Sequence, residues 1–326
     1  MYNQIEAILS QYDMEINGVT KGRGSYICNT NQGMKELVPF CGSKEKGIFL
    51  KEYLSELNKK GFVVEQIVQN KNEEVITEDE GTGERFVLKD YVEGKELNTS
   101  SREEMKEAVL LLADYHRTST MLEIEIPDKL KGNEKTVTEG YRRHYRELVK
   151  VKNYIRNRKK KNEFEQIYMK YFSQMLSTAE ESITCLEKKE GEVGESGICH
   201  GEVNQHNIIH ANGRWYMIHF ENCSYSWRIT DLANFLRKMM EKNNWDIELG
   251  LELIKSYDSH YELHAEELQK LYGILLFPEK FWKITNHYIN SRKTWISERD
   301  IDKLKKVIEQ ENQRINFVQN LFQMNG

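Results

Sequence analysis

Polar side chains that could take part in chemistry gather in three segments of the second half of the sequence. The segments read HGEVNQHN at residues 200–207, MIHFE at residues 217–221 and TDLANFL at residues 230–236. Between the first two, apolar runs on either side of Asn212-Gly213 predict two β-strands, the second over Trp215–Phe220, because Asn-Gly favours a tight hairpin turn. The loop Cys199–His206 therefore leads into a two-stranded ribbon, a rigid platform at whose edges we expect reactive groups.

Histidines make a metal site one candidate for this chemistry. Four of them lie in or near the three segments: His200, His206, His210 and His219. Zinc needs ligands that converge, and histidines spread over a loop and a hairpin, without an HxxxH helix, need not do so. The five cysteines are scattered and form no CxxC pair, which favours reduced thiols over a zinc site or a disulfide framework. Zinc is therefore the weaker hypothesis.

Taken together, the three segments resemble the signature of the aminoglycoside phosphotransferase and choline kinase group: HGDxxxxN, a hydrophobic hairpin, an I-D-[FW]-[DE] strand and a D-L-A helix. The chain is more closely similar to the CotS family of bacterial spore coat proteins, which shares that fold. Three further stretches carry the resemblance: YVEGKEL at 91–97, like the family's hinge, LADYH at 112–116, and LLFPEKFWK at 275–283. The resemblance spans nearly the whole chain and implies a phosphotransfer site.

Such a site needs a cation on the ATP phosphates, oxygen ligands for Mg²⁺, and a carboxylate that orients the attacking hydroxyl. The resemblance puts the family's ATP-binding lysine at Val38. Lys35 is expected to face the opposite side of that strand, because strand side chains alternate, unless a one-residue bulge intervenes. The hinge resemblance implies Tyr91 and Glu93 as nucleotide-binding positions. Thr20–Ser25 lies where a phosphate-covering loop would be, although a lone GxG is a weak motif.

The acidic positions of the family's pattern are altered as well. The catalytic positions of the pattern fall on His200 and Glu202, with Glu202 in place of the family's catalytic Asp. Glu is one methylene longer than Asp, and a displacement of a reacting group by ~1 Å can cost about a hundredfold in rate. Asn207 matches the metal-binding Asn. The metal-binding Asp is His219, whose neutral imidazole is a poor ligand for a hard Mg²⁺ ion. Glu221, two residues further along the predicted strand, would face the same side and could replace it.

These departures affect three of the four groups that phosphotransfer needs. We therefore predict a spore coat or sporulation-associated protein with a degenerate site, which acts by binding and assembly and has no resident cofactor. Its partners would be other spore coat proteins or a small ligand in the cleft. The alternative is an active small-molecule kinase that uses ATP and Mg²⁺, with Glu202 as base and Asn207 and Glu221 on the metal. A third hypothesis is a nucleotide-binding regulator without turnover. Asp231 begins a helix and is interpreted as structural support for the catalytic loop.

Hydrophobic periodicity predicts the elements that position these residues. The N-terminal part contains helices at 6–12 and 43–60 and strands at 26–30, 34–40, 63–68, 74–77 and 85–92. Apart from the hairpin, the remainder is helical, at 105–116, 141–154, 164–188, 231–241, 247–257, 265–276, 279–289 and 298–322. The resemblance and this order predict an α+β, bilobal, protein-kinase-like fold. Residues 1–94 would form a small antiparallel-sheet lobe, and residues 95–326 a large helical lobe that includes the catalytic-loop hairpin.

Composition excludes several other classes. The 326 residues are 39% hydrophobic and 30% charged with three prolines, so disordered and collagen-like chains are excluded. The net charge of −5 argues against nucleic acid as a partner, and the basic run at 156–161 is interpreted as a solvated helix end. No apolar stretch approaches the ~20 residues of a membrane helix, and no signal peptide is visible. We expect cytoplasmic synthesis and, from the resemblance, deposition on the spore coat.

Overall fold

The structure, a computed structural model, describes residues 2–131, 137–188, 196–291 and 297–323. The chain packs as two compact units. The first comprises residues 1–98, 107–133 and 197–225, and the second comprises residues 99–106, 134–196 and 226–326. These units are packing groups, and the predicted lobe boundary after residue 94 stays a prediction.

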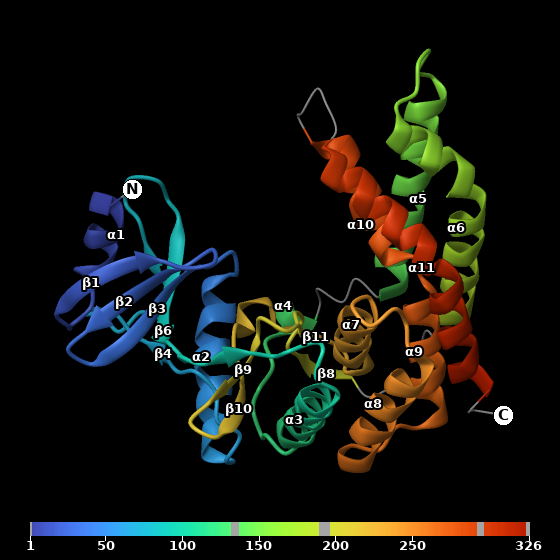
Figure 1. Cartoon of the computed structure of the whole chain (residues 1–326). Helices are drawn as coiled ribbons and strands as arrows, with labels where there is room; N and C mark the ends of the chain where they lie inside the picture. The colour runs from blue at the N-terminus through green and yellow to red at the C-terminus, as the bar shows by residue number, and fades with distance from the viewer. Residues whose placement is uncertain (1, 132–136, 189–195, 292–296, 324–326) are drawn as a thin grey trace. The chain divides into compact units, whose positions relative to one another are not determined.

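The first unit contains a six-stranded antiparallel sheet (Figure 1). Its strands in the described part of the chain are β1 (Ile16–Lys21), β2 (Tyr26–Thr30), β3 (Gly33–Pro39), β4 (Ile67–Val68), β5 (Thr77–Glu78) and β6 (Arg85–Asp90). They lie in the order β1-β2-β3-β6-β4, and β5 also pairs with β6. The β3–β6 register sets Glu36 opposite Lys89 and Val38 opposite Val87, without a shift.

The two faces of this sheet differ in chemistry, because successive side chains alternate. Leu37 and Leu88 are fully buried in a cluster with residues of α1 (Tyr2–Leu9), such as Ile8. Their neighbours Glu36 and Lys89 point to the opposite face. An apolar face therefore packs on α1, and the other face carries charged groups.

Three more helices belong wholly or mostly to the first unit: α2 (Lys44–Lys59), α3 (Arg102–Thr120) and α4 (Asp128–Lys131). The sequence specifies the ends of α2, since Ser43 caps the Lys46 N–H at 3.2 Å and Gly61 follows the helix at φ +88°. Tyr53 of α2 donates a hydrogen bond to the Tyr115 hydroxyl of α3 at 2.9 Å, which joins the two helices.

The predicted ribbon is present as β9 (Ile208–Ala211) and β10 (Arg214–Met217), with β7 (Lys95–Glu96) on the other side of β9. Asn212 and Gly213 turn at φ 51° and 75°, as the Asn-Gly signal predicted. The second strand is shorter than predicted, because the chain leaves it after Met217 and His219 takes a left-handed conformation at φ 68°. The residues that follow form the 3₁₀-helix η1 (Phe220–Asn222). A further pair of strands consists of β8 (Ser196–Cys199) and β11 (Ser224–Trp227).

The second unit is helical, as predicted. Its described helices are α5 (Val137–Arg156), α6 (Glu163–Glu187), α7 (Ile229–Met240), α8 (Ile247–His260), α9 (Ala265–Leu276), α10 (Glu279–Asn290) and α11 (Glu298–Gln323). One apolar core joins α5, α6, α10 and α11 through fully buried side chains that include Leu148, Tyr168, Phe281 and Leu304. Asn162 and Glu165 form a capping box that begins α6.

Two sequence predictions in the first unit need correction. Strand β1 was not predicted, because this edge strand has mostly exposed polar side chains and no apolar alternation. The strands predicted at 63–68 and 74–77 shrink to the two-residue β4 and β5.

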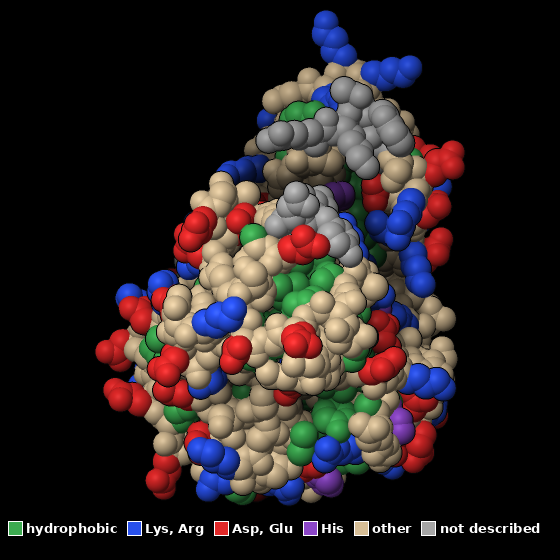
Figure 2. All heavy atoms as spheres, turned by 90° about the vertical axis from the view of Figure 1, so that its left-hand side faces the viewer, with side chains coloured by type: hydrophobic (Ala, Val, Ile, Leu, Met, Phe, Trp, Pro, Cys, Tyr) green, Lys and Arg blue, Asp and Glu red, His purple; other side chains and the backbone are tan. Residues whose placement is uncertain are grey.

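On the face of the molecule shown in Figure 2, Lys and Arg side chains are interspersed with Asp and Glu, and neither sign of charge forms a continuous patch. None of the described helices is both long and apolar enough to span a bilayer.

Candidate phosphotransfer-type site

A cavity of about 630 Å³ lies within the first unit, on the charged face of its sheet. Its size falls within the usual range of small-molecule sites, about 300–1,000 Å³. Six of the residues that the resemblance places in a phosphotransfer site line it: Val38, Tyr91, Glu202, Asn207, His219 and Glu221. Residues from opposite ends of the unit's sequence therefore meet at one place.

Val38 faces this cavity from β3, at the position where the resemblance puts the ATP-binding lysine. Lys35 does not replace it. The ladder between β2 and β3 runs without a bulge, and the Lys35 ammonium pairs with Asp90 at 2.7 Å. The lysine position is therefore apolar, and the nearest lysine on the same strand is committed elsewhere.

The sequence analysis missed a buried cation that pairs with two residues of the cavity wall, Glu36 and Glu221. Lys89 of β6 is 1% exposed, and its ammonium lies 2.9 Å from a Glu65 oxygen and 3.9 Å from a Glu36 oxygen. The same ammonium forms an ion pair with Glu221 and lies 3.0 Å from Nδ1 of His219. We call these five residues the Lys89 cluster. It contains one lysine, one histidine and three carboxylates, so its carboxylates outnumber its lysine.

The pKa values in the Lys89 cluster follow from burial and these contacts. Burial alone would lower the pKa of Lys89, but the three carboxylates outweigh it and raise that pKa above its usual value. Burial would raise the pKa of Glu221, yet Lys89 and His219 hold it well below its usual range. Burial raises the pKa of Glu65, and Lys89 only partly opposes this shift. The lysine is thus held charged by the protein's own carboxylates.

Glu65 also explains the unusual backbone at His219. Its Oε1 accepts the backbone N–H of His219 at 2.7 Å and that of Phe220 at 3.4 Å. These bonds hold the chain in the left-handed turn that ends the ribbon. The turn and η1, rather than strand alternation, bring both His219 and Glu221 to the cavity. The sequence analysis predicted their proximity from strand geometry, and that reason was wrong.

The catalytic-loop positions keep part of the geometry that phosphotransfer needs. Asn207 donates from Nδ2 to the Glu202 carbonyl at 2.8 Å, which leaves its amide oxygen as the atom able to bind a cation. The Glu202 carboxylate accepts from Asn222 at 2.7 Å. Gly201, at φ +81°, allows the tight loop, since a Cβ there would lie 2.3 Å from the Asn222 carbonyl oxygen.

The other residues predicted for the site lie outside the cavity wall or deeper. His200 is fully buried. Its Nδ1 accepts a hydrogen bond from the backbone N–H of Glu202, and its Nε2 bonds to the Ile218 carbonyl, so His200 orients the loop that contains Glu202. Glu93 is exposed beside Tyr91. Asp231 is buried in the first turn of α7 and belongs to the second unit.

The loop between β1 and β2 contributes Arg23 and Ser25 to the cavity. Ser25 donates a 2.6 Å hydrogen bond to a carboxylate oxygen of Glu36, and Arg23 pairs with Glu96 at 3.5 Å. In the predicted role, this loop would cover phosphates. Here its side chains bond to carboxylates of the same unit.

The four histidines considered for zinc lie in different surroundings. His206 bonds Glu96 at 2.6 Å, His210 packs against the Trp215 ring, and His200 and His219 lie as described above. Over the described residues, no group of three or more His, Cys, Asp or Glu side chains has the arrangement of a metal site.

Glu36, Glu65 and Lys89 were the site residues that sequence reasoning missed. The one available signal was a lysine that directly follows an apolar run, Phe86-Val87-Leu88. Two of the carboxylates that pair with Lys89 are far from it in the sequence: Glu65 is 24 positions away and Glu221 is 132 positions away. No local pattern therefore joins them to the lysine.

Comparison with solved structures identifies the fold. An aminoglycoside phosphotransferase from Alicyclobacillus acidocaldarius matches with a TM-score of 0.82 at 19% identity, over 98% of this chain and 96% of that one. A spectinomycin phosphotransferase, solved with ADP and spectinomycin, matches at 0.67 and 12%, over 99% and 98%. A microcompartment-associated aminopropanol kinase matches at 0.65 and 13%, over 100% and 99%. The chain thus has the kinase-like aminoglycoside phosphotransferase fold that the sequence predicted.

The family follows from the sequence itself. No curated protein matches the chain. A family model described as "Spore coat putative kinase YutH" matches residues 5–321, which is nearly the whole chain. The CotS-like resemblance drawn from the sequence is thereby confirmed. This chain belongs to the spore coat putative kinase family YutH.

Proposed function

We propose that this protein acts in the spore coat by binding and assembly, with a kinase-like site that no longer transfers phosphate. One observation carries the proposal: the buried ammonium of Lys89 lies among the carboxylates of Glu36, Glu65 and Glu221. In a phosphotransferase, carboxylates at such a site hold metal ions and a cation contacts the phosphates. Here the cation neutralises the carboxylates directly.

Two features of the site disfavour a magnesium–ATP complex. The Glu221 carboxylate would have to give up Lys89 before it could bind a metal ion, and the remaining protein ligand would be the Asn207 amide. The position expected to supply a cation to the phosphates holds Val38. The residues present therefore fit magnesium and ATP poorly, which supports a site without a resident cofactor.

The family supports a place in the spore coat. We propose that the protein is made in the mother-cell cytoplasm and then deposited on the coat, where it binds other coat proteins or a small ligand in the cavity. Fractionation of sporulating cells and purified spores checks this location. Recovery from the vegetative cytoplasm alone would contradict it.

An active small-molecule kinase is the second candidate, and one observation favours it. Lys46, in the first turn of α2, lines the same cavity and could contact phosphates. Glu202 would then orient the acceptor hydroxyl, and Asn207 and Glu221 would hold Mg²⁺. This arrangement requires Glu221 to exchange Lys89 for the metal ion.

Nucleotide binding and turnover separate the two candidates. We expect the wild-type protein to show no thermal shift with ATP and Mg²⁺, although a ligand at 100 times its Kd would add about 2.7 kcal/mol of stability. ATP turnover should not exceed background. The comparison protein carries Val38→Lys, Glu202→Asp and His219→Asp together, because groups that act as a unit are not additive.

A gain of nucleotide binding in the triple variant, with none in wild type, would support the assignment of the site. Phosphate transfer by wild type to a small alcohol or amine at about 1–100 s⁻¹, an ordinary kinase rate, would refute the proposal and leave the active kinase in its place.

A further inference from the structure

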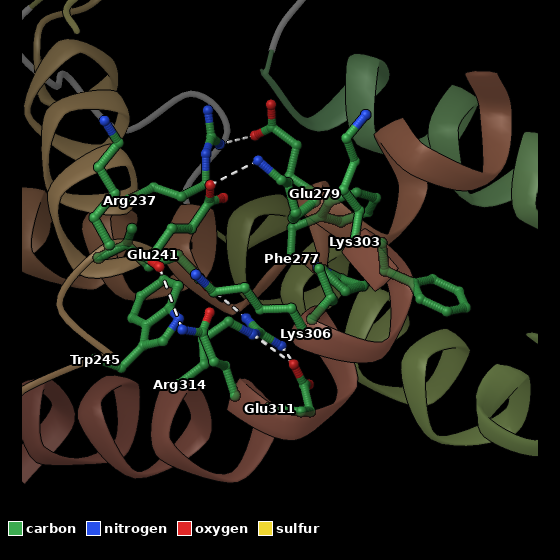
Figure 3. A pocket seen from close by; sticks show the side chains of 16 residues that line it. Arg237, Glu241, Trp245, Phe277, Glu279, Lys303, Lys306, Glu311 and Arg314 are labelled. Atoms are coloured by element: carbon green, nitrogen blue, oxygen red, sulfur yellow. Dashed lines mark hydrogen bonds and ion pairs between the residues drawn. The ribbon is translucent and has the colours of Figure 1, made fainter. Parts of the chain in front are cut away.

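A second cavity, of about 230 Å³, lies entirely within the second unit (Figure 3). Its walls come from α7 and the residues just after it, from the connection between α9 and α10, and from α11. None of its lining residues takes part in the Lys89 cluster or lines the cavity of the first unit. The function proposed above therefore makes no use of it.

Apolar side chains form the floor of this second cavity. Trp245, Leu275, Phe277 and Phe281 all line it and are at most 4% exposed. Burying apolar area is favourable by about 25 cal/mol per Å², so this floor suits the ring or the chain of a ligand.

Charged groups surround that floor, and positive ones are in excess. Six lining residues are basic and three are acidic, although the chain as a whole has a net charge of −5. Each acidic residue has a basic partner in the wall: Glu279 pairs with Arg237, Glu241 with Lys280 and Glu311 with Arg314. Figure 3 shows these three pairs as dashed lines.

The basic residues that remain are Lys242, Lys303 and Lys306. Lys303 pairs with Asp300 at 3.0 Å, outside the cavity wall. Among the described residues, no carboxylate lies within ion-pair distance of Lys242 or Lys306 in the structure. In Figure 3, the Lys306 side chain extends from α11 across the cavity. Two lysine ammonium groups are thus available to a ligand at the edge of an apolar floor.

The surroundings of Lys238 agree with an excess of positive charge. This lysine belongs to α7 and is partly buried. Burial lowers its pKa, and the neighbouring cations Arg237, Lys283 and Lys280 lower it further, against the opposing effect of Glu241.

We propose that the second cavity binds a small amphipathic anion, an aromatic or short aliphatic body with a phosphate or carboxylate head group. The body would pack on Trp245 and Phe277, and the head group would bind between Lys242 and Lys306. Cavities of about 150 Å³ with apolar walls already hold benzene, so one of this size has room for a six-membered ring and its head group. Arg314 is not a candidate for the head group, because Glu311 and the Leu275 and Leu276 carbonyls occupy its donors.

Titration calorimetry of the full chain tests this proposal with four probes: phenyl phosphate, benzoate, inorganic phosphate and benzyl alcohol. We expect phenyl phosphate or benzoate to bind, and the tighter of the two identifies the head group. Inorganic phosphate lacks the apolar body and benzyl alcohol lacks the charge, so both should bind at least about tenfold more weakly. Binding should also weaken between about 0.05 and 0.5 M salt, because the lysines lie at the cavity edge.

The double variant Lys242→Gln, Lys306→Gln should bind the preferred anion at least about tenfold more weakly, since charge-assisted hydrogen bonds are lost. Lys255→Gln, an exposed lysine of α8, is the matched control and should bind like wild type. Circular dichroism verifies that each variant is folded. The proposal is overturned if neither anion binds wild type at millimolar concentration, if the double variant binds unchanged, or if inorganic phosphate or benzyl alcohol binds as tightly as the preferred anion.

Discussion

Replacing Lys89 by methionine tests how much the cluster in the first unit depends on its one lysine. Methionine keeps most of the length and apolar stem of the side chain and removes the ammonium. The variant then leaves Glu36, Glu65 and Glu221 close together without their shared cation. Removing one partner of a buried ion pair costs about 3–5 kcal/mol, because the remaining charge stays buried and uncompensated. We expect a loss of that size at pH 7.5.

The loss should shrink as the pH falls. Without Lys89, at least one of the buried carboxyl groups has a pKa raised well above the unfolded value, so the folded variant binds a proton that the unfolded chain releases. Stability then rises with acidity by about 1.4 kcal/mol per pH unit and proton. Between pH 7.5 and 5.5, we therefore expect the variant to regain roughly 2–3 kcal/mol relative to wild type.

Urea unfolding at the two pH values measures the difference, and hydrogen exchange of the β3 and β6 amides assigns it to the first unit. Lys35→Met is the matched control, because it removes a lysine from the adjacent strand of the same sheet. Its partner Asp90 has a side chain that is 43% exposed, so that pair should contribute only about 0–1 kcal/mol. Equal effects of the two substitutions, or a Lys89→Met effect that does not change with pH, would refute this electrostatic explanation.

Three further predictions concern other parts of the structure. Gly201→Ala should lower the free energy of unfolding by about 2 kcal/mol or more, because the added Cβ would lie 2.3 Å from a backbone carbonyl oxygen. Gly213 also has a positive φ but open space around it, so Gly213→Ala should lower it by only about 1 kcal/mol in the same urea assay. Burial lowers the pKa of His219, but Glu221 and Glu65 outweigh this effect, so NMR should show that His219 titrates above 6.5; titration below 6.5 would contradict this. Protonated His219 then stabilises the fold, and this contribution is lost as the pH rises through its pKa. Arg314→Met should destabilise the protein by about 3–5 kcal/mol, because it leaves the Glu311 carboxylate buried without its partner. Adding Glu311→Met should restore part of this stability in thermal unfolding, and a double variant as unstable as the single one would contradict the pairing.

Much of the fold follows from patterns that act locally. The Asn212-Gly213 turn and the apolar stripes of the long helices depend on residues a few positions apart, and the sequence predicted both. The same is true of Val38, whose orientation follows from strand alternation once the strand is known. Edge strand β1 escaped prediction because its two apolar residues that pack on the core, Ile16 and Val19, are three positions apart and do not alternate as strand residues do.

The electrostatics of the site could not be predicted in the same way. Whether a carboxylate binds a metal ion or a lysine depends on which side chain fills the space beside it. That depends on how residues 36, 65, 89 and 221 meet across the folded unit. Strand alternation, not the family pattern, suggested Glu221 as a substitute metal ligand, and the structure shows it paired with Lys89. A pattern of conserved positions contains no information about a lysine at a position that the pattern does not include.

The two cavities differ in the sign of their uncompensated charge. In the first unit, the cavity wall has four acidic residues, Glu36, Glu96, Glu202 and Glu221, and two lysine or arginine residues, Arg23 and Lys46. In the second unit, the basic residues of the wall outnumber the acidic ones by six to three. Under the two proposals above, a polyphosphate would meet an excess of carboxylates at the first cavity, whereas an anion would meet lysines at the second. The loss of phosphate transfer that we propose for the first cavity would not imply loss of anion binding by the protein, because the residues that would do each task are different.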